Sequence, residues 1–572
     1  MTNACTAEGN VAEALFTLKI HRGEGMCLLA MNWRDGQPSM DFVGFAIEYQ
    51  EPGNPNFFAV KNRLNFEGSA DSTSSVARPP SYSTLAAPIQ KFRWVHFPFR
   101  ADLAGLFTYR VTPVFMNEDG ELHYGVAQTA SLELARETYP GVLNVAFTRG
   151  FVSSQAFVDR YISQGSIDTL LPATNAQGLT FTPTHPQAQD AYAWMGFEAR
   201  AEMLATLDQA IGDPTAEVGV IAYDFNLPDV LDRVKKLPKD KVRIIIDDSK
   251  DHLGGGSAED AAAQTLTGLG YQVKRQHMGS LQHNKIIWVA GDAVNRVICG
   301  STNMSWRGLY VQSNNAIIME GAAVAKIFKD AFDLYWSTPD DFPKAPSAEW
   351  IDLGLDDVDV KLTFSPHRKA NSALKGIGAD IGTATSSIFY SLAFLASTPG
   401  AIRNALAAQT QKDDVFVAGI SDQRTGIAVA SGSSNAPPTY VQALDKDAPP
   451  PFSNEPTGLA GGVGTRMHHK FIVIDFNTDN ARVYTGSYNM SLAADGSNGE
   501  NLLLIRDRRV ATAYMVEALS MIDHYEFRVA QKDAARRKTT LSLDRPPAAG
   551  ATAWWAEDWT DPHKVRDRLL FA

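Results

Sequence analysis

One polar motif occurs twice in the chain, and the two copies have the same order and nearly the same spacing. The first copy reads LQHNKIIWVAGDAVNRVICGSTNMSWRG, and the second reads RMHHKFIVIDFNTDNARVYTGSYNMSLA. His283 and Lys285 of the first copy correspond to His468 and Lys470 of the second, 185 residues later. Repetition on this scale predicts a duplicated domain rather than a solenoid, so the chain is expected to fold into two similar halves.

Each copy continues into a second apolar strand that ends in a GSxNxS turn. The turns supply two serine–asparagine pairs, Ser301 with Asn303 and Ser487 with Asn489. Residues two apart on a strand point to the same side, so each histidine shares a face with its lysine. A single HxK is usually a surface histidine beside a solvated lysine, and a single GSxN is an ordinary turn. The ordered repeat of both favours a shared functional site.

The pattern of strands and helices around the motifs is also repeated. In the first half, apolar runs at Glu217–Tyr223 and Lys241–Ile246 predict buried strands, with a short helix over Pro228–Leu237 between them. The second half repeats this order at Ser387–Phe394, Ala401–Gln409 and Asp414–Ile420. Strand–helix–strand units of this length predict right-handed crossovers in a parallel or mixed sheet.

The first 140 residues have a different texture. Aromatic and β-branched runs separated by turn-rich segments predict strands at Phe16–Ile20, Phe42–Tyr49, Phe92–Phe97 and Phe107–Val114. No long helical period appears before about residue 153, after which Ser153–Ile162 and Ala191–Ile211 are expected to be helical. This pattern favours a β-sandwich at the N-terminus.

The charge of the chain excludes one class of function. The 572 residues include 52 Lys and Arg against 64 Asp and Glu, which gives a formal net charge of −12. A globally basic nucleic-acid coat is therefore excluded, whereas a local basic cleft is compatible with this charge. The cysteines Cys5, Cys27 and Cys299 are too far apart to predict a disulfide framework or a CxxC metal pair, which favours a reducing compartment.

The N-terminal segment MTNACTAEGNVAEALF has no basic start and no apolar core of a secretory signal. The sequence also has no run of about eighteen apolar residues that could span a membrane. We therefore expect a cytoplasmic protein, with export by a non-classical route left open.

The paired residues suit one kind of chemistry. One imidazole can attack phosphorus while the other protonates the leaving oxygen. Two lysine ammonium groups and two asparagine amides can stabilise the nonbridging oxygens of a phosphoryl group. The serines can satisfy turn backbone groups or donate to phosphate. The set predicts phosphodiester cleavage with no metal and no other cofactor.

The order HxKxxxxD followed by GSxN resembles the signature of the phospholipase D superfamily, and the resemblance extends over about residues 141–530. The segments FTRGFVSSQAFVDRY and HYEFR are similar to those of bacterial phospholipase-D-like proteins with an N-terminal sandwich. The resemblance implies an α/β fold with two pseudo-twofold-related domains, 141–346 and 347–572, preceded by an all-β sandwich over 1–140. It also implies one site at the seam and a phosphohistidine intermediate.

The two copies depart from each other at two supporting positions. Asp475 completes the second motif, whereas the first has Ala290 there and Asp292 two residues further on. A carboxylate eleven residues after the asparagine, which in the family reaches the histidine of the other half, is Glu500 in the second copy and Asn314 in the first.

The resemblance thus implies that Glu500 contacts His283 and that Asn314 contacts His468. A carboxylate on Nδ1–H raises the basicity of an imidazole and stabilises its charged form more than an amide does. We therefore predict that His283 is the nucleophile and His468 the general acid. Their partners in the predicted site are Lys285, Asn303, Lys470, Asn489 and Glu500, supported by Asp475, Ser301, Ser487 and Asn314.

Two other clusters could hold a metal. His468 and His469 are adjacent, but structural zinc needs further Cys or His at short spacing, and strand alternation points His469 away from the site. Asp247 and Asp248 end a strand, where we interpret them as an exposed acid pair rather than as ligands of calcium or magnesium. Asp251-His252 and the glycines at 254–256 predict a flexible loop, since the GK[ST] of a phosphate cradle is absent.

Three aromatic or loop segments remain. Trp306 and Arg307 follow the first turn, where substrate contact and ordinary packing or surface charge are equally favoured. The segment 431–464 is rich in Gly, Pro and Ser and is a candidate lid. Three C-terminal tryptophans are interpreted as a packed tail rather than a membrane anchor, namely Trp554, Trp555 and Trp559.

The favoured function is a phospholipase D that hydrolyses glycerophospholipids or transfers their phosphatidyl group. A nuclease of the same type is the first alternative, because fold and catalytic set alone do not separate the two. A degenerate module that binds a phosphodiester without cutting it is the second. We expect a phospholipid or other phosphodiester as substrate, no obligate nucleic acid and a monomer, with peripheral membrane contact left open.

Overall fold

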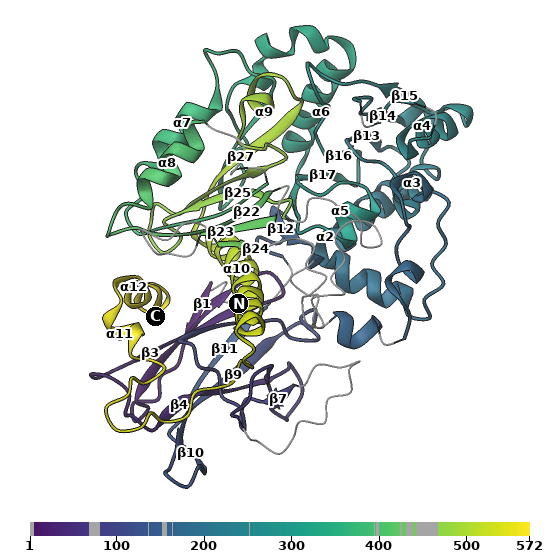
Figure 1. The fold of residues 1–572 in the computed structure, drawn as a ribbon. Helices are drawn as coiled ribbons and strands as arrows, with labels where there is room; N and C mark the ends of the chain where they lie inside the picture. The colour runs from purple at the N-terminus through teal and green to yellow at the C-terminus, as the bar shows by residue number, and fades with distance from the viewer. Residues whose placement is uncertain are drawn as a thin grey trace.

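The computed structural model describes residues 5–67, 81–134, 137–150, 157–162, 164–250, 252–254, 256–393, 395, 400–423, 426–430, 439–441 and 467–572. The N-terminal region forms two packed antiparallel sheets (Figure 1). One sheet has the order β1-β2-β3-β8, with bounds Thr6–Glu8, Phe16–Arg22, Cys27–Trp33 and Arg93–His96. The other has the order β10-β9-β4-β5 with β11 beside β9, and bounds Leu122–Tyr124, Leu106–Met116, Phe42–Gln50, Phe58–Ala59 and Gln128–Glu133.

Alternation explains why these segments form a sandwich. In β2, Phe16, Leu18 and Ile20 are buried, while the residues between them are partly exposed. A strand with this period buries one face, so two such sheets pack their apolar faces together. The interior is aromatic, with the rings of Phe42 and Phe45 5.1 Å apart. The predicted sandwich is confirmed.

The first α/β half is built on a seven-stranded mixed sheet of order β12-β18-β17-β16-β13-β14-β15. The bounds are Leu143–Phe147, Asn315–Glu320, Asn295–Gly300, Ile286–Ala290, Glu217–Ala222, Val242–Ile246 and Gln272–Arg275. Strands β13, β14 and β15 run parallel to one another, while β16, β17, β18 and β12 pair antiparallel. The helices are α2 Ala188–Gly212, α3 Pro228–Val234, α4 Ala258–Gly268, α5 Trp306–Tyr310 and α6 Ala322–Ser337.

The second half repeats this topology. Its sheet has the order β19-β20-β27-β26-β25-β21-β22-β23-β24, so that β20-β27-β26-β25-β21-β22 matches β12-β18-β17-β16-β13-β14. The bounds are Ile351–Asp352, Asp359–Ser365, Glu500–Arg506, Arg482–Gly486, Lys470–Ile474, Ser387–Leu392, Phe416–Gln423, Gly426–Ala430 and Thr439–Val441. The helices of this half are α7 Ala373–Ile381, α8 Ala401–Gln409, α9 Leu492–Gly496 and α10 Arg508–Arg537. The predicted duplication is confirmed in strand order.

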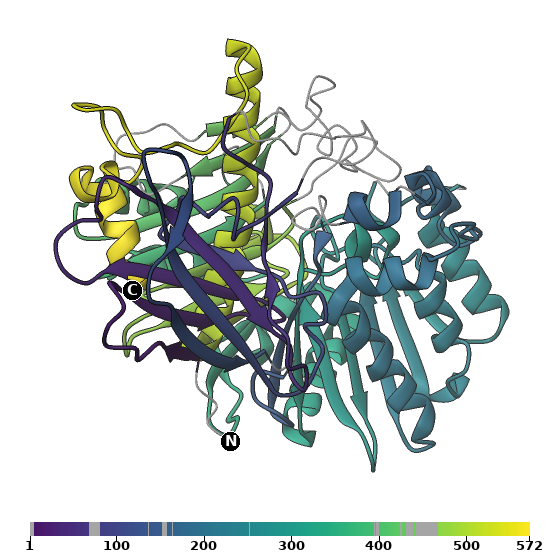
Figure 2. The same cartoon turned by 90° about the horizontal axis from the view of Figure 1, so that it is seen from below.

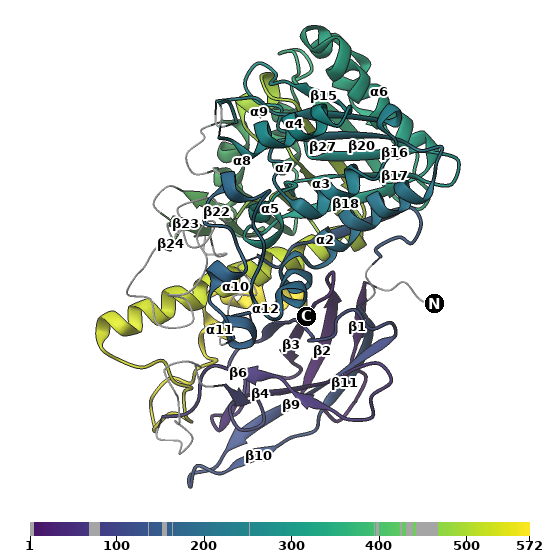
Figure 3. The ribbon, with the colours of Figure 1, turned by 90° about the vertical axis from the view of Figure 1, so that its right-hand side faces the viewer.

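Helix α10 connects the second half to the sandwich. It packs on strands of both, and it lies between the sandwich and the α/β halves in two perpendicular views (Figures 1 and 3). After α10 the chain returns to the sandwich through α11 Glu557–Thr560 and α12 Pro562–Phe571. Trp554 stacks on Phe92 with ring centroids 5.5 Å apart, and Trp555 is buried in the same core. The tryptophans therefore belong to a packed tail, as predicted.

The two α/β halves lie side by side when the molecule is viewed from below (Figure 2). Backbone hydrogen bonds join them on either side of the paired motifs. The amide of His283 donates to the carbonyl of Gly499 at 2.9 Å, and the amide of His468 donates to that of Ser313 at 3.1 Å. Gly499 in turn donates to Leu281 at 2.9 Å. Backbone hydrogen bonds thus join the two halves at the residues from which both imidazole rings project.

Two predicted segments fall partly outside the described residues. Of the expected helix over 153–162, the described part forms a π-helical turn at Val158–Ile162. Of the candidate lid at 431–464, only strand β24 lies inside them, and the lid stays a prediction. Among the described residues, no helix combines the length and apolar character needed to cross a bilayer.

Candidate active site

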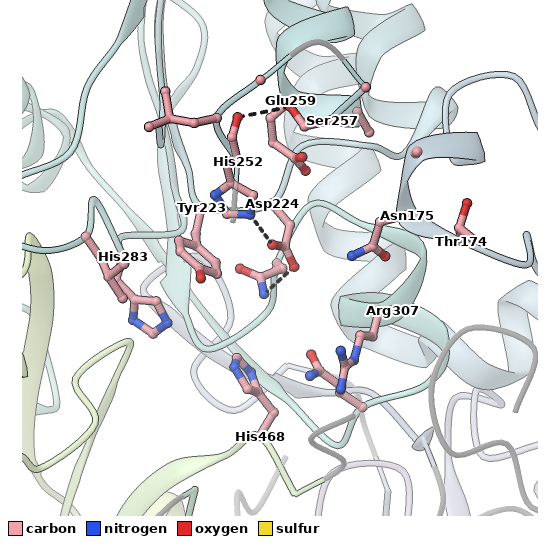
Figure 4. A pocket seen from close by; sticks show the side chains of 18 of the residues that line it. Thr174, Asn175, Tyr223, Asp224, His252, Ser257, Glu259, His283, Arg307 and His468 are labelled. Carbon is pink, nitrogen blue, oxygen red and sulfur yellow. Dashed lines mark hydrogen bonds and ion pairs between the residues drawn. The ribbon is translucent and has the colours of Figure 1, made fainter. Parts of the chain in front are cut away.

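The two HxK segments converge on one site. His283 and Lys285 directly precede β16, and Lys470 begins β25, with His468 two residues before it. The imidazole rings of His283 and His468 have centroids 6.4 Å apart. Figure 4 shows them together at one end of a pocket, approaching from opposite halves. Both are largely buried, with exposed fractions of 4% and 7%.

The glycine of each GSxNxS turn is required by the backbone. Gly300 and Gly486 have φ values of 129° and 139°, in a region that side chains rarely adopt. A Cβ at either position would collide with the backbone oxygen of Asn315 or Asn501 on the neighbouring strand. Close approach of these strands therefore fixes where the turn begins and where the polar side chains after it point.

Glu500 contacts the ring of His283. Its Oε2 lies 2.7 Å from Nδ1, and the carboxylate also accepts from Ser487 Oγ at 2.7 Å and Asn498 Nδ2 at 3.0 Å. Burial alone would raise the pKa of Glu500, but the charges of His283 and Lys285 hold it below its ordinary value. An ionised Glu500 fixes the proton of His283 on Nδ1 and leaves Nε2 with its lone pair.

Asn314 occupies the corresponding place beside His468. Its Oδ1 lies 2.8 Å from Nδ1 of His468, and its Nδ2 donates to the carbonyl of Gly308 at 2.8 Å, which sets the orientation of the amide. Burial, followed by the charges of Lys470 and Lys285, lowers the pKa of His468 well below its usual value. Burial also lowers the pKa of His283, but there Glu500 opposes the effect.

Both lysines are buried, and each contacts the histidine of its own motif. Lys285 Nζ donates to the carbonyl of His283 at 2.5 Å, and Lys470 Nζ donates to that of His468 at 2.8 Å. Lys470 Nζ also lies 3.1 Å from Nε2 of His468. Burial lowers the pKa of Lys285 to about 8, and it lowers the pKa of Lys470 well below its usual value. A bound phosphodiester anion would offset this crowding of cations and raise both values.

The two asparagines of the GSxNxS turns line the pocket, whereas the two serines differ in their hydrogen-bond partners. Asn303 Nδ2 donates to Asp224 Oδ2 at 2.9 Å, and Asn489 also lines the pocket. Ser301 Oγ accepts the amide of Asn315 at 3.0 Å, while Ser487 Oγ donates to Glu500. The two serines therefore satisfy turn backbone and orient the carboxylate.

The pocket has a volume of about 890 Å³ and belongs mostly to the first half. Its only described lining residues from the second half are His468 and Asn489. Tyr223 forms a wall whose ring lies 4.9 Å from that of His283 and 4.5 Å from that of His252, measured between centroids. Arg307 also lines it, whereas Trp306 donates to the carbonyl of Gly178 in a packed aromatic cluster. Sequence reasoning left these two undecided.

The interpretation of Asp247 as an exposed strand-end acid was wrong. Asp247 is fully buried rather than exposed, and its Oδ2 lies 2.7 Å from Nδ1 of His252. The other ring nitrogen of His252 lies 3.2 Å from Asp224 Oδ1. Burial opposes a charge on His252, but the two aspartates raise its pKa to about 10. A loop that reads as Gly-rich and flexible thus carries a buried imidazole into the pocket.

Asp224 and Glu259 also line the pocket, and sequence reasoning missed them. Asp224 comes two residues after the end of β13, at the C-terminal edge of the parallel strands, where sites of open α/β sheets gather. That position was the available signal. Glu259 is in the first turn of α4, whose N-cap is Ser257. Nothing in its local sequence distinguishes it from an ordinary first-turn acid.

Asp475 and its missing counterpart are both explained. Asp475 accepts hydrogen bonds from the amides of Thr385, Ser386 and Ser387 at 2.8 to 3.1 Å, and so holds the turn before β21. In the first half the acid is supplied by Asp213, which accepts from the amides of residues 293 and 294 after β16 at 2.8 and 3.1 Å. Asp292 is exposed and does not take this place.

His469 points away from the pocket. Its ring is fully buried, and Nε2 lies 3.1 Å from a carboxylate oxygen of Glu517 on α10. Nδ1 faces Asn315 at 3.3 Å. The alternation of the strand therefore separates His469 from His468, and the two do not form a metal pair.

A family model described as "Cardiolipin synthase, PLD-like domain" matches residues 207–336 and 377–522, one match in each half. The phospholipase D proteins of Rickettsia prowazekii (strain Madrid E) and Rickettsia typhi (strain ATCC VR-144 / Wilmington) are each 44% identical to this chain over 48 residues. That alignment covers 8% of this chain and 22% of each relative, so the chain spans about a fifth of their length.

Among solved structures, phosphatidylserine synthase from Haemophilus influenzae Rd KW20 is similar over 60% of this chain and 92% of its own, with 12% identity and a TM-score of 0.40. The phospholipase D family member Nuc from Salmonella typhimurium covers 24% of this chain and 86% of its own, with 25% identity and a TM-score of 0.20. With the family model matching both halves and the duplicated motifs meeting in one pocket, the chain belongs to the phospholipase D superfamily.

Proposed function

We propose that this protein is a phospholipase D that hydrolyses glycerophospholipids, or transfers their phosphatidyl group to an alcohol, through a phosphohistidine on His283. The observation that carries the proposal is the pair of facing imidazoles, of which one bears a carboxylate partner and the other an amide. Membership of the superfamily supports action on a phosphodiester. The lipid substrate is the finer part of the proposal.

In the first step, the lone pair on Nε2 of His283 attacks phosphorus. The bond between phosphorus and the leaving oxygen breaks, and that oxygen takes a proton from Nε2 of His468. Glu500 stabilises the positive ring that forms, because its carboxylate accepts the Nδ1 proton of His283 at 2.7 Å. The negative charge of the bound diester raises the pKa of His468, so this ring enters the step protonated.

In the second step, the roles of His468 reverse. Its neutral ring takes a proton from water or from an acceptor alcohol, whose oxygen attacks the phosphohistidine and displaces Nε2 of His283. Lys285 and Lys470, with the amides of Asn303 and Asn489, stabilise the nonbridging oxygens through both steps. The residues of the chain thus supply the charge that a metal supplies in other phosphodiesterases.

Three observations support a lipid rather than a nucleic acid. The net charge is −12, and the described lining of the pocket has one arginine and no lysine while it includes the acids Asp224 and Glu259. A nuclease needs a basic groove for several phosphates. The curated relatives, matched over a short segment, are phospholipases D by name.

The test compares three diesters with the purified full chain: phosphatidylcholine dispersions, single-stranded DNA and bis(p-nitrophenyl) phosphate. We expect lipid turnover to exceed DNA cleavage, with the His283→Ala variant, purified in parallel, as the control for contaminating enzymes. Salt-sensitive DNA cleavage without lipid turnover would replace the lipid proposal by a nuclease. Failure to turn over all three would leave a module that binds phosphodiesters without cutting them.

A further inference from the structure

Three potential metal ligands meet in the pocket beside the paired histidines. Asp224 follows β13, His252 lies in the loop before α4, and Glu259 lies in the first turn of that helix. One ligand atom from each lies within 4.8 Å of the other two. Figure 4 shows the three side chains gathered on the side of Tyr223 away from His283. The phosphodiester mechanism above uses none of them.

The orientation of His252 is the one that a metal-binding histidine takes. Its Nδ1 faces Asp247 Oδ2 at 2.7 Å, and Asp247 is itself fixed by the amides of Gln282 at 2.6 Å and Ser249 at 2.9 Å. A carboxylate on one ring nitrogen sets the tautomer and aims the other nitrogen at a ligand site. Here the other nitrogen, Nε2, is aimed at Asp224 from 3.2 Å.

The buried acceptor atoms around the cluster provide a second, independent observation. Glu259 is only 3% exposed, and its Oε1 accepts the amide of Phe225 at 3.1 Å. The carboxylate also accepts a hydrogen bond from the backbone amide of Glu259 itself, and it points toward Asp224 (Figure 4). The amide oxygen of Asn303, whose nitrogen donates to Asp224, is buried without a donor. A metal ion bound here would displace the Nε2 proton of His252 and place a larger positive charge among these buried acceptors.

We propose that Asp224, His252 and Glu259 bind one divalent transition-metal ion of the Zn²⁺ or Mn²⁺ type. One imidazole and two carboxylates suit such ions, and three protein ligands leave at least one coordination position open. The open position faces the pocket, where it can take water or a polar oxygen of a bound molecule. The ion is separate from the paired histidines, to which it is linked through Asn303 and Tyr223.

Among the residues that the structure describes, such a group of three ligands is present in the first half alone. Ile221 of β13 pairs with Ile286, three residues after His283, and Ser391 of β21 pairs with Phe471, three residues after His468. By this register, the position of Asp224 corresponds to Phe394 in the sequence, which has no ligand atom. The sequence of the second half thus has no carboxylate at the position that corresponds to Asp224.

The test is a calorimetric titration of the untagged, metal-stripped full chain with Zn²⁺ and, separately, with Mn²⁺. We expect one ion per chain, bound with micromolar or tighter affinity, and a rise in Tm on binding. Glu259→Gln keeps the size of the side chain and should weaken binding by about tenfold or more, and His252→Asn should do the same. Circular dichroism and Tm without metal establish that each variant is folded.

His277 offers a matched control. It also faces an aspartate through Nδ1, at 2.6 Å from Asp248, but its side chain is half exposed. His277→Ala should leave the affinity unchanged. Absence of saturable binding, or binding that survives Glu259→Gln at full strength, would overturn the proposal. Because the readout is metal affinity, failure here is distinguishable from failure of the proposed diester hydrolysis.

Discussion

The two α/β halves have the same strand order and the same HxK and GSxN motifs, yet they orient their histidines differently. The ring of His283 rests on the carboxylate of Glu500, and that of His468 rests on the amide of Asn314. Each partner comes from the opposite half. A duplicated fold has therefore kept the positions of two imidazoles while giving them unequal basicity, which is what separate roles as nucleophile and acid require.

The two halves also differ in which strand supplies the aspartate that binds the turn at the end of the neighbouring strand. In the second half, Asp475 follows the motif strand β25 and binds the turn before β21. In the first half, Asp213 precedes β13 and binds the turn after the motif strand β16. The missing aspartate at Ala290 is thus compensated across the same pair of neighbouring strands. The contact is retained, although the residue that makes it has moved.

The largest effects should come from the two histidines. His283→Ala should lower turnover of both lipid and p-nitrophenyl esters to background, because no covalent intermediate can form. His468→Ala should lower lipid turnover by about 10²- to 10⁴-fold but retain more activity on p-nitrophenyl esters, whose leaving group needs little protonation. Steady-state rates on both substrates check this, and the opposite pattern would exchange the roles of the two halves.

The partners of the rings should give the next largest effect. Glu500→Gln should lower kcat about 10- to 100-fold, whereas Asn314→Ala should cost less, because it removes a neutral acceptor. Glu500 raises the pKa of His283, so its loss should move the acid limb of the kcat/KM profile toward lower pH. Asn314→Ala should leave that limb in place. Equal losses and equal profiles in the two variants would contradict the unequal roles.

Asp213, which replaces the motif aspartate in the first half, should make the stability of that half sensitive to low pH. Hydrogen bonds from the Thr215 side chain and the amide of Ala293 lower the pKa of Asp213 to about 2, below its ordinary value of 3.8. Its stabilising contribution is present above about pH 4 and is lost as the pH falls toward 2. Asp213→Asn should lower Tm by a few degrees near neutral pH and by less near pH 2, as measured by calorimetry. A deficit that does not shrink on acidification would contradict this account.

The smallest effect on catalysis is expected from chelation. EDTA should leave the rate on bis(p-nitrophenyl) phosphate nearly unchanged, since lysines and amides stabilise the phosphoryl oxygens. EDTA should lower the Tm of protein loaded with Zn²⁺, because it removes an ion that binds to the folded state and stabilises it. Complete loss of turnover that Zn²⁺ restores would show that the first half contributes a metal to the chemistry.

The sequence alone predicts those parts of the site that follow from the order and spacing of residues within each motif. The repeat of His283 and Lys285 at His468 and Lys470 predicts the duplication, and a fixed step from each asparagine leads to the partner of the opposite ring. These inferences work because strand register turns spacing into position. Their contacts are present in the structure, and the catalytic roles stay predictions.

The remainder of the site depends on tertiary contacts that spacing does not encode. Asp247 reads as an exposed strand-end acid, yet His252 and the loop before β16 close over it. Glu259 reads as a first-turn acid of α4, and only the contact of this turn with the segment after β13, through the amide of Phe225, brings it to Asp224. Asp213 was missed because it replaces a motif residue from a distant part of the chain.

The backbone hydrogen bonds across the seam limit how far the two halves can move apart at the site. The amide hydrogens of His283 and His468 are both donated across the seam, to Gly499 and Ser313. Neither can exchange with solvent by local fraying of its own strand; the halves must first separate. These two amides should accordingly be among the slowest to take up deuterium, and a substrate must reach the imidazoles through the pocket mouth while the seam stays closed.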